Sequence, residues 1–211
     1  LYSVVFMVDY ALVARAVLRA ERGKAHQAQF RYMKLKQQVN PHFLFNSLNI
    51  LDCLVCEQRT EQASAYIHKL AGIYRYMLQN EEETLVRLRE EMAFVGMYVD
   101  LLQVRFPEGF RVETDISDEA MNRHVLPCSV QLLIENAIKH NSVGADRPLV
   151  IRIVAGAGAV TVSNNLQLKV SGTTSTRVGL NYIRQQYLDL SGIPIGIRRT
   201  DTEYCVTLPL L

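Results

Sequence analysis

The stretch QQVNPHFLFNSLNIL, residues 37–51, has apolar residues at helical spacing and a proline in its interior. Pro41 inside a helix removes one backbone hydrogen bond and clashes with the preceding turn, at a cost of about 3 kcal/mol. Such a cost is tolerated where a local distortion is useful. His42, Asn46 and Asn49 follow it and share one helical face. Two interpretations stay open from spacing and chemistry: a hydrogen-bonded polar network in a core, or a functional histidine.

The helical pattern extends well beyond this stretch. Apolar residues recur at spacings of three and four from Arg19 to Gln58 and again from Glu61 to Gln79, with a short polar link at 57–60. Two helices joined by a tight link form a hairpin, and a hairpin with one apolar stripe rarely survives alone. We therefore expect two copies of the chain to pair into a dimeric four-helix bundle.

The first fourteen residues, LYSVVFMVDYALVA, are nearly all apolar, and a run rich in cations follows them. A membrane-spanning helix needs about 20 apolar residues, and Asp9 and Arg15 interrupt this run. An apolar stretch followed by cations fits the cytoplasmic edge of a membrane helix, but an amphipathic core helix with a basic face fits it equally well. Because the chain starts at Leu1 without a methionine, we expect it to be a piece of a longer protein.

Length and composition exclude several classes of protein. The chain has 211 residues, 49% of them hydrophobic and 21% charged, which is enough for one ordinary domain and a smaller element. This excludes a disordered tail, a collagen-like repeat and a small disulfide scaffold. The net charge of +2 gives no case for direct nucleic-acid binding. The charge is uneven, since 1–80 is net basic and 81–211 is net acidic.

The cysteines carry no metal pattern. Cys53 and Cys56 form a C-x-x-C pair, but Cys128 and Cys205 are far away and supply no second pair at zinc-site spacing. We expect the first two thiols to pack as small apolar side chains on a helix. Four unpatterned cysteines suit a reducing cytoplasm.

Downstream of the acidic run at 81–83 the sequence predicts a helix at Leu88–Val104, and after it strand-like patterns alternate with helical ones. We expect strands at Phe110–Ile116, Leu149–Val154 and Ala159–Ser163, helices at Leu126–Lys139 and Val178–Leu190, and a closing hairpin of Ile193–Arg199 and Tyr204–Leu208. This order predicts an α/β sandwich with helices on one face of a mixed sheet, so the whole chain falls in the α+β class.

The stretch at 37–51 resembles the phosphoacceptor segment of the LytS-type sensor histidine kinases, a family of bacterial two-component kinases. The resemblance implies that His42 is phosphorylated at a ring nitrogen. A neutral imidazole, with an ordinary pKa of about 6.5, is a suitable nucleophile. Many other histidine kinases have an acidic residue directly after this histidine as a base, and here the position is Phe43. A base must therefore come from elsewhere or be dispensable.

A second polar group lies in QLLIENAIKHN, residues 131–141, where Glu135, Asn136, Lys139 and His140 share one helical edge. An amide oxygen suits Mg²⁺, and the two basic side chains suit phosphate oxygens. A solvated last turn would explain the basic pair but not the Glu-Asn pair. The segment resembles the N box of the GHKL ATP-binding fold. That resemblance implies that Asn136 is the magnesium ligand, that Lys139 and His140 approach the phosphates, and that Glu135 is a possible general base.

The adenine turn of that fold departs from its pattern here. In the fold an Asp-Asn-Gly turn binds adenine through its Asp, and VTVSNNL, residues 160–166, places Asn164, Asn165 and Leu166 there. An amide oxygen still accepts a hydrogen bond but without the charge, so the resemblance implies weaker adenine binding at Asn164.

The phosphate-facing Gly-x-Gly-Leu segment departs as well. STRVGLNYIRQQY, residues 175–187, keeps Gly179 and Leu180 but has Arg177 in place of the first Gly. The guanidinium could bind phosphate in compensation. The resemblance thus assigns all three residues to the nucleotide site. RYMLQNEEETLVRLREEMAFVGMYVDLLQVRF, residues 75–106, resembles the connection between bundle and catalytic domain in the same family.

Taken together, the resemblance implies a sensor histidine kinase that uses ATP and Mg²⁺ to phosphorylate His42 and passes the phosphoryl group to an aspartate in a response regulator receiver domain. It implies a membrane-proximal signalling helix at 1–29, a dimerisation and phosphotransfer hairpin at 30–82, and an ATP-binding domain at 83–211. The protein would be a homodimer held at the inner (cytoplasmic) membrane through a segment upstream of Leu1, with this portion facing the cytoplasm. Two alternatives remain: a dimeric signalling scaffold with a degenerate nucleotide site, and an ATP-hydrolysing chaperone-like or topoisomerase-like module.

Overall fold

The structure is a computed structural model, and it describes residues 41–80, 83–156, 158–169 and 178–211. The chain divides into two compact units, Leu1–Leu48 and Asn49–Leu211. The predicted segment at 1–29 and the helix expected from Arg19 to Asn40 lie outside the described residues. Within the described ranges, no helix has the length and apolar character that a membrane span requires.

Two helices open the described part of the chain: α2 (Pro41–Cys56) and α3 (Thr60–Gln79). The three residues between them turn sharply, with Gln58 at a φ of 58°, as predicted for the polar link. Cys53 and Cys56 are both exposed, so the prediction that these thiols are packed away as small apolar side chains is wrong for the single chain. The reason is that both lie on the outer face of α2, away from its buried Leu54.

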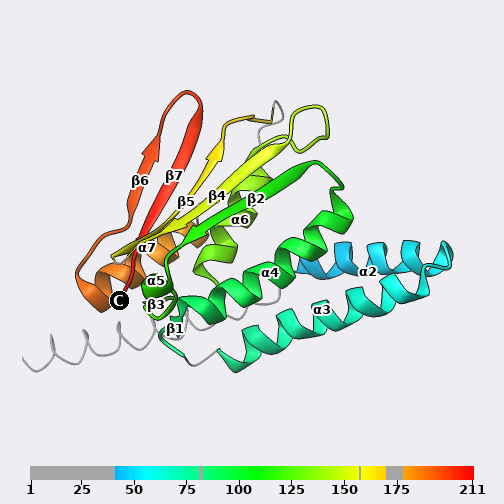
Figure 1. Cartoon of the computed structure of the whole chain (residues 1–211), viewed down its shortest axis with the longest axis horizontal. Coiled ribbons are helices and arrows are strands. Elements are labelled where there is room, and N and C mark those ends of the chain that lie inside the picture. The colour runs from blue at the N-terminus through cyan, green and yellow to red at the C-terminus, as the bar shows by residue number, and fades with distance from the viewer. Residues whose placement is uncertain (1–40, 81–82, 157, 170–177) are drawn as a thin grey trace, which may run out of the picture. The chain divides into compact units, whose positions relative to one another are not determined.

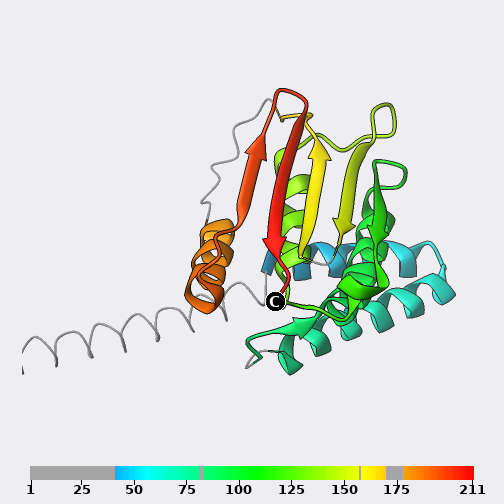
Figure 2. The same cartoon turned by 60° about the vertical axis from the view of Figure 1, so that its left-hand side comes forward.

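A five-stranded mixed sheet forms the centre of the second unit. Its strands are β2 (Phe110–Ile116), β4 (Leu149–Ala155), β5 (Ala159–Asn165), β7 (Glu203–Pro209) and β6 (Gly196–Arg199), in that spatial order (Figure 1). β2 and β4 are parallel, and the other neighbours are antiparallel. Figure 2 shows the same strands from another side, with helices behind them.

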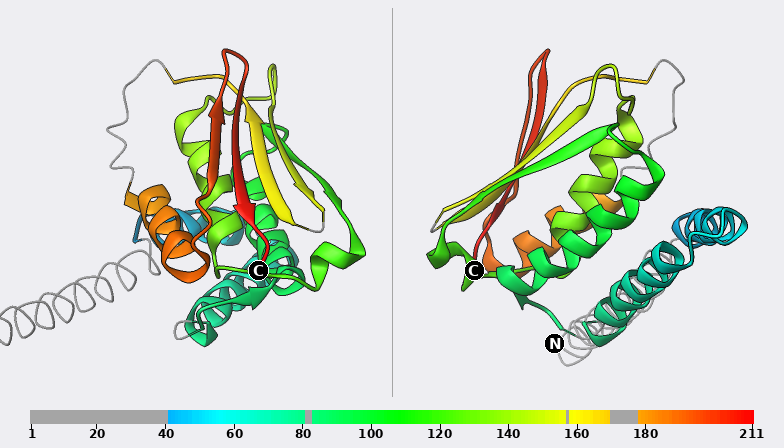
Figure 3. Two further views of the ribbon diagram at one scale, coloured as in Figure 1. Left: turned by 90° about the vertical axis from the view of Figure 1, so that its left-hand side faces the viewer. Right: turned by 45° about the vertical axis from the view of Figure 1, so that its right-hand side comes forward.

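The core of this unit lies between the sheet and α4 (Leu88–Arg105), α6 (Ser129–His140) and α7 (Val178–Ser191), which lie on one face of the sheet (Figure 3). Side chains alternate along β4: Leu149, Ile151 and Ile153 are fully buried, whereas Arg152 and Val154 are exposed. α6 packs directly on β4 and β5. The predicted α+β architecture, with helices on one face of a mixed sheet, is confirmed.

Three short elements have no counterpart in the sequence prediction. β1 (Val86–Arg87) pairs with β3 (His124–Val125), and α5 (Asp118–Met121) is a single turn capped by Ser117, whose Oγ accepts from the Ala120 N–H at 3.2 Å. Elements of two to four residues have no measurable periodicity. The helix predicted from Leu126 begins only at Ser129, because Cys128 has a φ of 61° and interrupts helical geometry.

Candidate functional site

α6 brings together the four residues that the sequence placed on one helical edge. Its apolar side, including Val130, Leu133 and Ile134, is buried in the core. The other side carries Glu135, Asn136 and His140, which are half-buried, and Lys139, which is exposed. Within the described part of the chain, no hydrogen bond engages the Asn136 side chain, so its amide oxygen can accept a ligand. No group of three or more His, Cys, Asp or Glu suited to a metal is found among the described residues.

The N-terminus of α6 is held by a carboxylate that the sequence pattern did not indicate. Glu91 of α4 is completely buried. Its Oε2 accepts from the Cys128 N–H at 2.9 Å, and its Oε1 accepts from the Val130 N–H at 3.0 Å. A third donor, the hydroxyl of Tyr76 in α3, binds the same Oε2 at 2.8 Å. Glu91 therefore satisfies backbone donors that the first turn of a helix leaves unpaired.

Burial dominates the electrostatics of Glu91. Removing a carboxylate from water disfavours its charged form, and burial raises the pKa of Glu91 to about 7 from an ordinary value of 4.5. The hydrogen bonds that it accepts favour the charged form and lower the pKa, but they do not offset the burial.

A second link from α4 orients Glu135. The Gln131 Nε2 donates to Glu135 Oε2 at 3.1 Å, one turn apart on α6. Burial raises the pKa of Tyr98 in α4, the nearby charge of Glu135 raises it further, and a hydrogen bond with Gln131 lowers it. Gln131 therefore lies between Tyr98 and Glu135 and ties the carboxylate of the predicted base to α4.

The C-terminal end of α6 is tied to the segment that follows β5. Asn141 is buried, and its Nδ2 donates to the Ala137 carbonyl while its Oδ1 accepts from the Gln167 N–H, both at 2.8 Å. The ammonium of Lys169 donates to the carbonyls of Ile138 and Lys139 at 3.1 and 3.0 Å. Cations are favoured at a helix C-terminus, so Lys169 acts as a cap from outside the helix.

Four basic residues are electrostatically coupled at this end of α6. Burial lowers the pKa of His140, and the charges of Lys139 and Lys169 lower it further. Burial also lowers the pKa of Lys169, followed by the charge of Arg105 at the end of α4. Cations that disfavour one another in this way would be stabilised by a polyanion such as a polyphosphate chain. The helical spacing indicated Lys139 and His140, but not Lys169 and Arg105, which come from other segments of the chain.

We expect Lys169→Met to raise the pKa of His140. Methionine retains most of the aliphatic side chain and removes a positive charge that disfavours the imidazolium. An NMR titration of the His140 ring carbons measures the shift, and Lys69→Met, which removes a cation in α3, is the matched control. An unchanged or lowered His140 pKa in Lys169→Met would contradict the electrostatic coupling.

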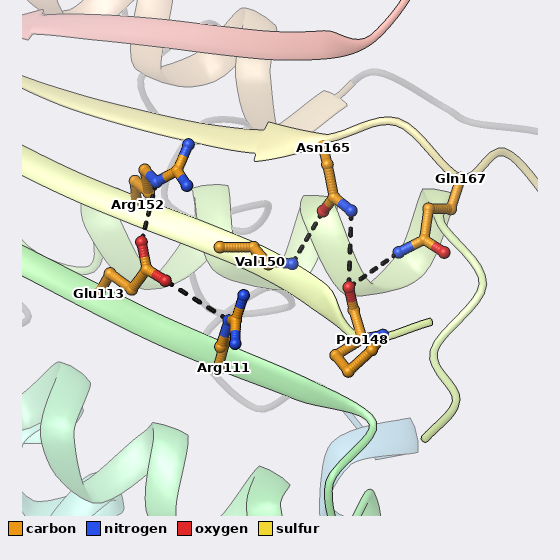
Figure 4. A network of polar contacts seen from close by, with 7 residues as sticks. All are labelled: Arg111, Glu113, Pro148, Val150, Arg152, Asn165 and Gln167. Atoms are coloured by element: carbon orange, nitrogen blue, oxygen red, sulfur yellow. Dashed lines mark hydrogen bonds and ion pairs between the residues drawn. The ribbon is translucent and has the colours of Figure 1, made fainter. Parts of the chain in front are cut away.

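The two asparagines at the end of β5 have different surroundings. Asn164 is buried, and its Nδ2 donates to the Asn165 carbonyl at 2.7 Å. Recognition of the adenine amino group would need the other atom of the amide, the acceptor Oδ1. Asn165 braces the start of β4: its Oδ1 accepts from the Val150 N–H at 2.8 Å (Figure 4). The amide of Gln167 donates to the Pro148 carbonyl at 3.1 Å in the same network. Asn165 is therefore a structural residue.

Other predicted site residues are only partly described. Arg177 lies outside the described residues. Gly179 lies in the first turn of α7, close to α6. A Cβ there would lie 2.9 Å from Leu132 Cδ1, so this glycine permits a close helix contact. Leu180 is half-buried in the same turn. His42 lies in the first turn of α2 and belongs to the compact unit Leu1–Leu48. Its side chain is not among those that the structure describes.

The chain has clear relatives. Residues 30–110 match the profile of the family described as Histidine kinase. The chain is 39% identical to the sensor protein LytS of Bacillus cereus over 106 residues, which is 50% of this chain and 18% of that protein. It is 29% identical to LytS of Staphylococcus haemolyticus over 190 residues, 82% of this chain and 32% of that protein.

The chain spans about a fifth to a third of the length of these curated relatives. A solved structure described as a bacterial phosphotransferase is similar with a TM-score of 0.47 at 12% identity, covering 84% of this chain and 94% of that one. The phosphoacceptor-like stretch and α4 both lie within residues 30–110, and the similarity to LytS of Staphylococcus haemolyticus extends over most of the chain. Residues 30–110 thus match the histidine kinase family, and the chain is similar to LytS-type sensor proteins over most of its length.

Proposed function

We propose that this chain is the kinase portion of a membrane-anchored sensor histidine kinase, which phosphorylates His42 from ATP and Mg²⁺. The observation that carries the proposal is the C-terminal end of α6, where Asn136 lies beside basic residues whose protonated forms disfavour one another. A site of this composition suits a magnesium-bound polyphosphate. The relatives carry the name of sensor proteins, which supports the same conclusion.

Each residue has a role in the proposal. ATP bound with Mg²⁺ supplies the γ-phosphoryl group in a form whose charge is partly neutralised. Asn136 would hold the metal through its amide oxygen. Lys139 and His140 would bind phosphate oxygens, with Lys169 and Arg105 adding positive charge. Asn164 would accept from the adenine amino group through Oδ1.

Three further residues of the nucleotide site follow from the family resemblance. Arg177, Gly179 and Leu180 would contact the phosphates, with the guanidinium of Arg177 offsetting the loss of a glycine. The close contact of Gly179 with Leu132 gives this glycine a packing role as well.

The phosphoryl acceptor is the His42 imidazole. A neutral ring nitrogen attacks phosphorus, the N–P bond forms, and the bond between phosphorus and the ADP oxygen breaks. The proton on the other ring nitrogen passes to a base, and Glu135 is the carboxylate that we assign to this role. The phosphoryl group then passes from His42 to an aspartate of a response regulator receiver domain.

We propose that the kinase is a homodimer paired through α2 and α3. Large apolar side chains of these helices are exposed in the single chain: Phe45, Leu48, Val55, Ile67 and Leu78. An exposed apolar stripe on a helical hairpin is typical of a surface that pairs with a second copy. The membrane anchor would lie upstream, with this portion on the cytoplasmic side.

The second candidate is a dimeric signalling scaffold without catalysis. Asn164 and Leu166 stand where the fold has Asp and Gly, and Arg177 stands where it has Gly. These observations favour weak nucleotide binding.

A labelling experiment with the chain separates the two candidates. We expect [γ-³²P]ATP with Mg²⁺ to give an acid-labile phosphoprotein, and EDTA to prevent its formation because the phosphates lose their bound metal. Calorimetry with Mg²⁺ and ATP measures binding independently. Absence of both label and binding at millimolar ATP would refute the kinase and favour the scaffold, whereas steady hydrolysis without phosphoprotein would favour a chaperone-like or topoisomerase-like ATPase.

A further inference from the structure

α3 and α4 lie side by side in antiparallel orientation (Figure 1). Lys69 of α3 pairs with Asp100 of α4. Closer to the other end, the Tyr76 ring stacks on the Phe94 ring with centroids 4.3 Å apart. The helices approach closely at Gly72, where an added Cβ would lie 2.8 Å from Met97 Sδ. The second helix of the hairpin is thus packed along α4, which in turn holds α6.

Tyr76 also makes a contact that reaches past α4. Its hydroxyl donates to Glu91 Oε2 at 2.8 Å, and the same oxygen accepts the Cys128 N–H at 2.9 Å. The second oxygen of Glu91 accepts the Val130 N–H in the first turn of α6. One buried carboxylate therefore joins a side chain of α3 to the backbone at the start of α6.

A residue of α7 also contacts the backbone just before α6. Tyr187 of α7 is fully buried, and its hydroxyl accepts from the Leu126 N–H at 3.4 Å. The backbone at Cys128 is in a left-handed conformation that a non-glycine residue adopts only when its surroundings hold it there. Loss of one donor from Glu91 would therefore be transmitted to a backbone segment whose conformation is held by its surroundings.

A shift at the start of α6 reaches its other end, because a helix of twelve residues moves as a unit. Asn136, Lys139 and His140 lie on the second half of α6. A displacement of α3 that breaks the Tyr76 hydrogen bond would thus change the placement of the side chains that bind nucleotide in the proposed function.

We propose that Glu91 is a positioning residue that couples the docking of α3 on α4 to nucleotide binding at α6, through the hydrogen bond from Tyr76. This inference rests on the proposed function, since the ligand of α6 is taken to be a nucleotide. Coupling between two sites is reciprocal. Bound nucleotide therefore strengthens the docking of α3, and docked α3 strengthens nucleotide binding by the same factor.

Amide hydrogen exchange of α3, with and without Mg²⁺ and the non-hydrolysable analogue AMP-PNP, tests the coupling. In the wild type we expect the nucleotide to slow exchange in α3 by roughly fivefold or more, the lower end of typical allosteric coupling. Tyr76→Phe retains the ring that stacks on Phe94 and removes only the donor to Glu91. We expect it to reduce the slowing to less than about twofold and to weaken AMP-PNP binding by about fivefold.

Lys69→Met is the matched control. It removes another α3–α4 contact, but its partner Asp100 lies toward the other end of α4 from Glu91. We expect the nucleotide to slow exchange in Lys69→Met by the wild-type factor, even where basal exchange is faster. The ratio of the exchange rates without and with nucleotide separates coupling from a merely structural role, because a structural role would change only the exchange rate without nucleotide.

Two results would overturn the inference, and they are distinct. If the wild type binds AMP-PNP and exchange in α3 does not respond, or if Tyr76→Phe responds like the wild type, the coupling is refuted and the proposed function stands. If the wild type binds no AMP-PNP, the proposed function fails and the inference fails with it.

Discussion

His42→Gln is expected to reduce incorporation of phosphate from [γ-³²P]ATP to background. Glutamine is similar in length and polarity to histidine, but its amide nitrogen is not nucleophilic, because its lone pair is delocalised into the carbonyl. The N–P bond therefore cannot form, and no other step of the reaction compensates. Autoradiography after electrophoresis at neutral pH measures the label, with a parallel acid treatment that removes phosphoramidate.

His68→Gln is the matched control for this substitution. His68 is exposed on α3, and its Nδ1 lies 2.8 Å from the Ser64 carbonyl oxygen, within one helical turn. We expect this variant to be labelled as strongly as the wild type. Calorimetry should show that both variants bind Mg²⁺ and ATP like the wild type, because neither substitution lies in α6. Equal labelling of His42→Gln and the wild type would remove His42 from the mechanism.

Sequence periodicity predicted the larger elements closely. The strand expected at Phe110–Ile116 is observed with the same ends, and the helix expected at Glu61–Gln79 is observed at Thr60–Gln79. These segments have clear patterns because each buries one face. The start of α6 was predicted three residues early, because the left-handed backbone at Cys128 depends on distant contacts and has no glycine to mark it.

The residues of the candidate site also divide into those that the sequence could reveal and those that it could not. The residues on the edge of α6 could be found from their spacing, since a helix places them together whatever surrounds it. Glu91 could not be found in this way. Beside Glu90 it reads as part of an exposed acidic pair, and its burial depends on Tyr76 and Cys128, which are distant in sequence. Lys169 was missed for the same reason, since its partners are carbonyls about thirty residues earlier.

Glu91 connects stability to pH with a definite sign. Its pKa in the folded chain is about 7, above the ordinary value of 4.5, because burial disfavours the carboxylate. Between these two values the folded chain holds a proton that the unfolded chain has lost, so the unfolding free energy falls as pH rises through this window. The stabilising contribution is fully present below pH 4.5 and is lost as pH rises through 7.

Glu91→Gln is expected to remove this pH dependence. Glutamine cannot ionise, and one of its two terminal atoms is a donor, so at least one of the three donors around Glu91 loses its acceptor. An unpaired buried donor costs about 1–3 kcal/mol, which lowers stability at acidic pH. At pH 8 the wild type instead carries the cost of a buried carboxylate, so the variant loses less there.

The measurement is urea unfolding of the wild type and Glu91→Gln from pH 5 to 8. We expect the stability advantage of the wild type over the variant to shrink by about 2–3 kcal/mol across this range, as a pKa of about 7 against 4.5 requires. Glu119→Gln, at an exposed position on α5, removes a carboxylate from the surface and should leave the pH profile as in the wild type. If the profiles of Glu91→Gln and the wild type stay parallel, Glu91 is ionised throughout the range, and its three hydrogen bonds, rather than its burial, determine its charge.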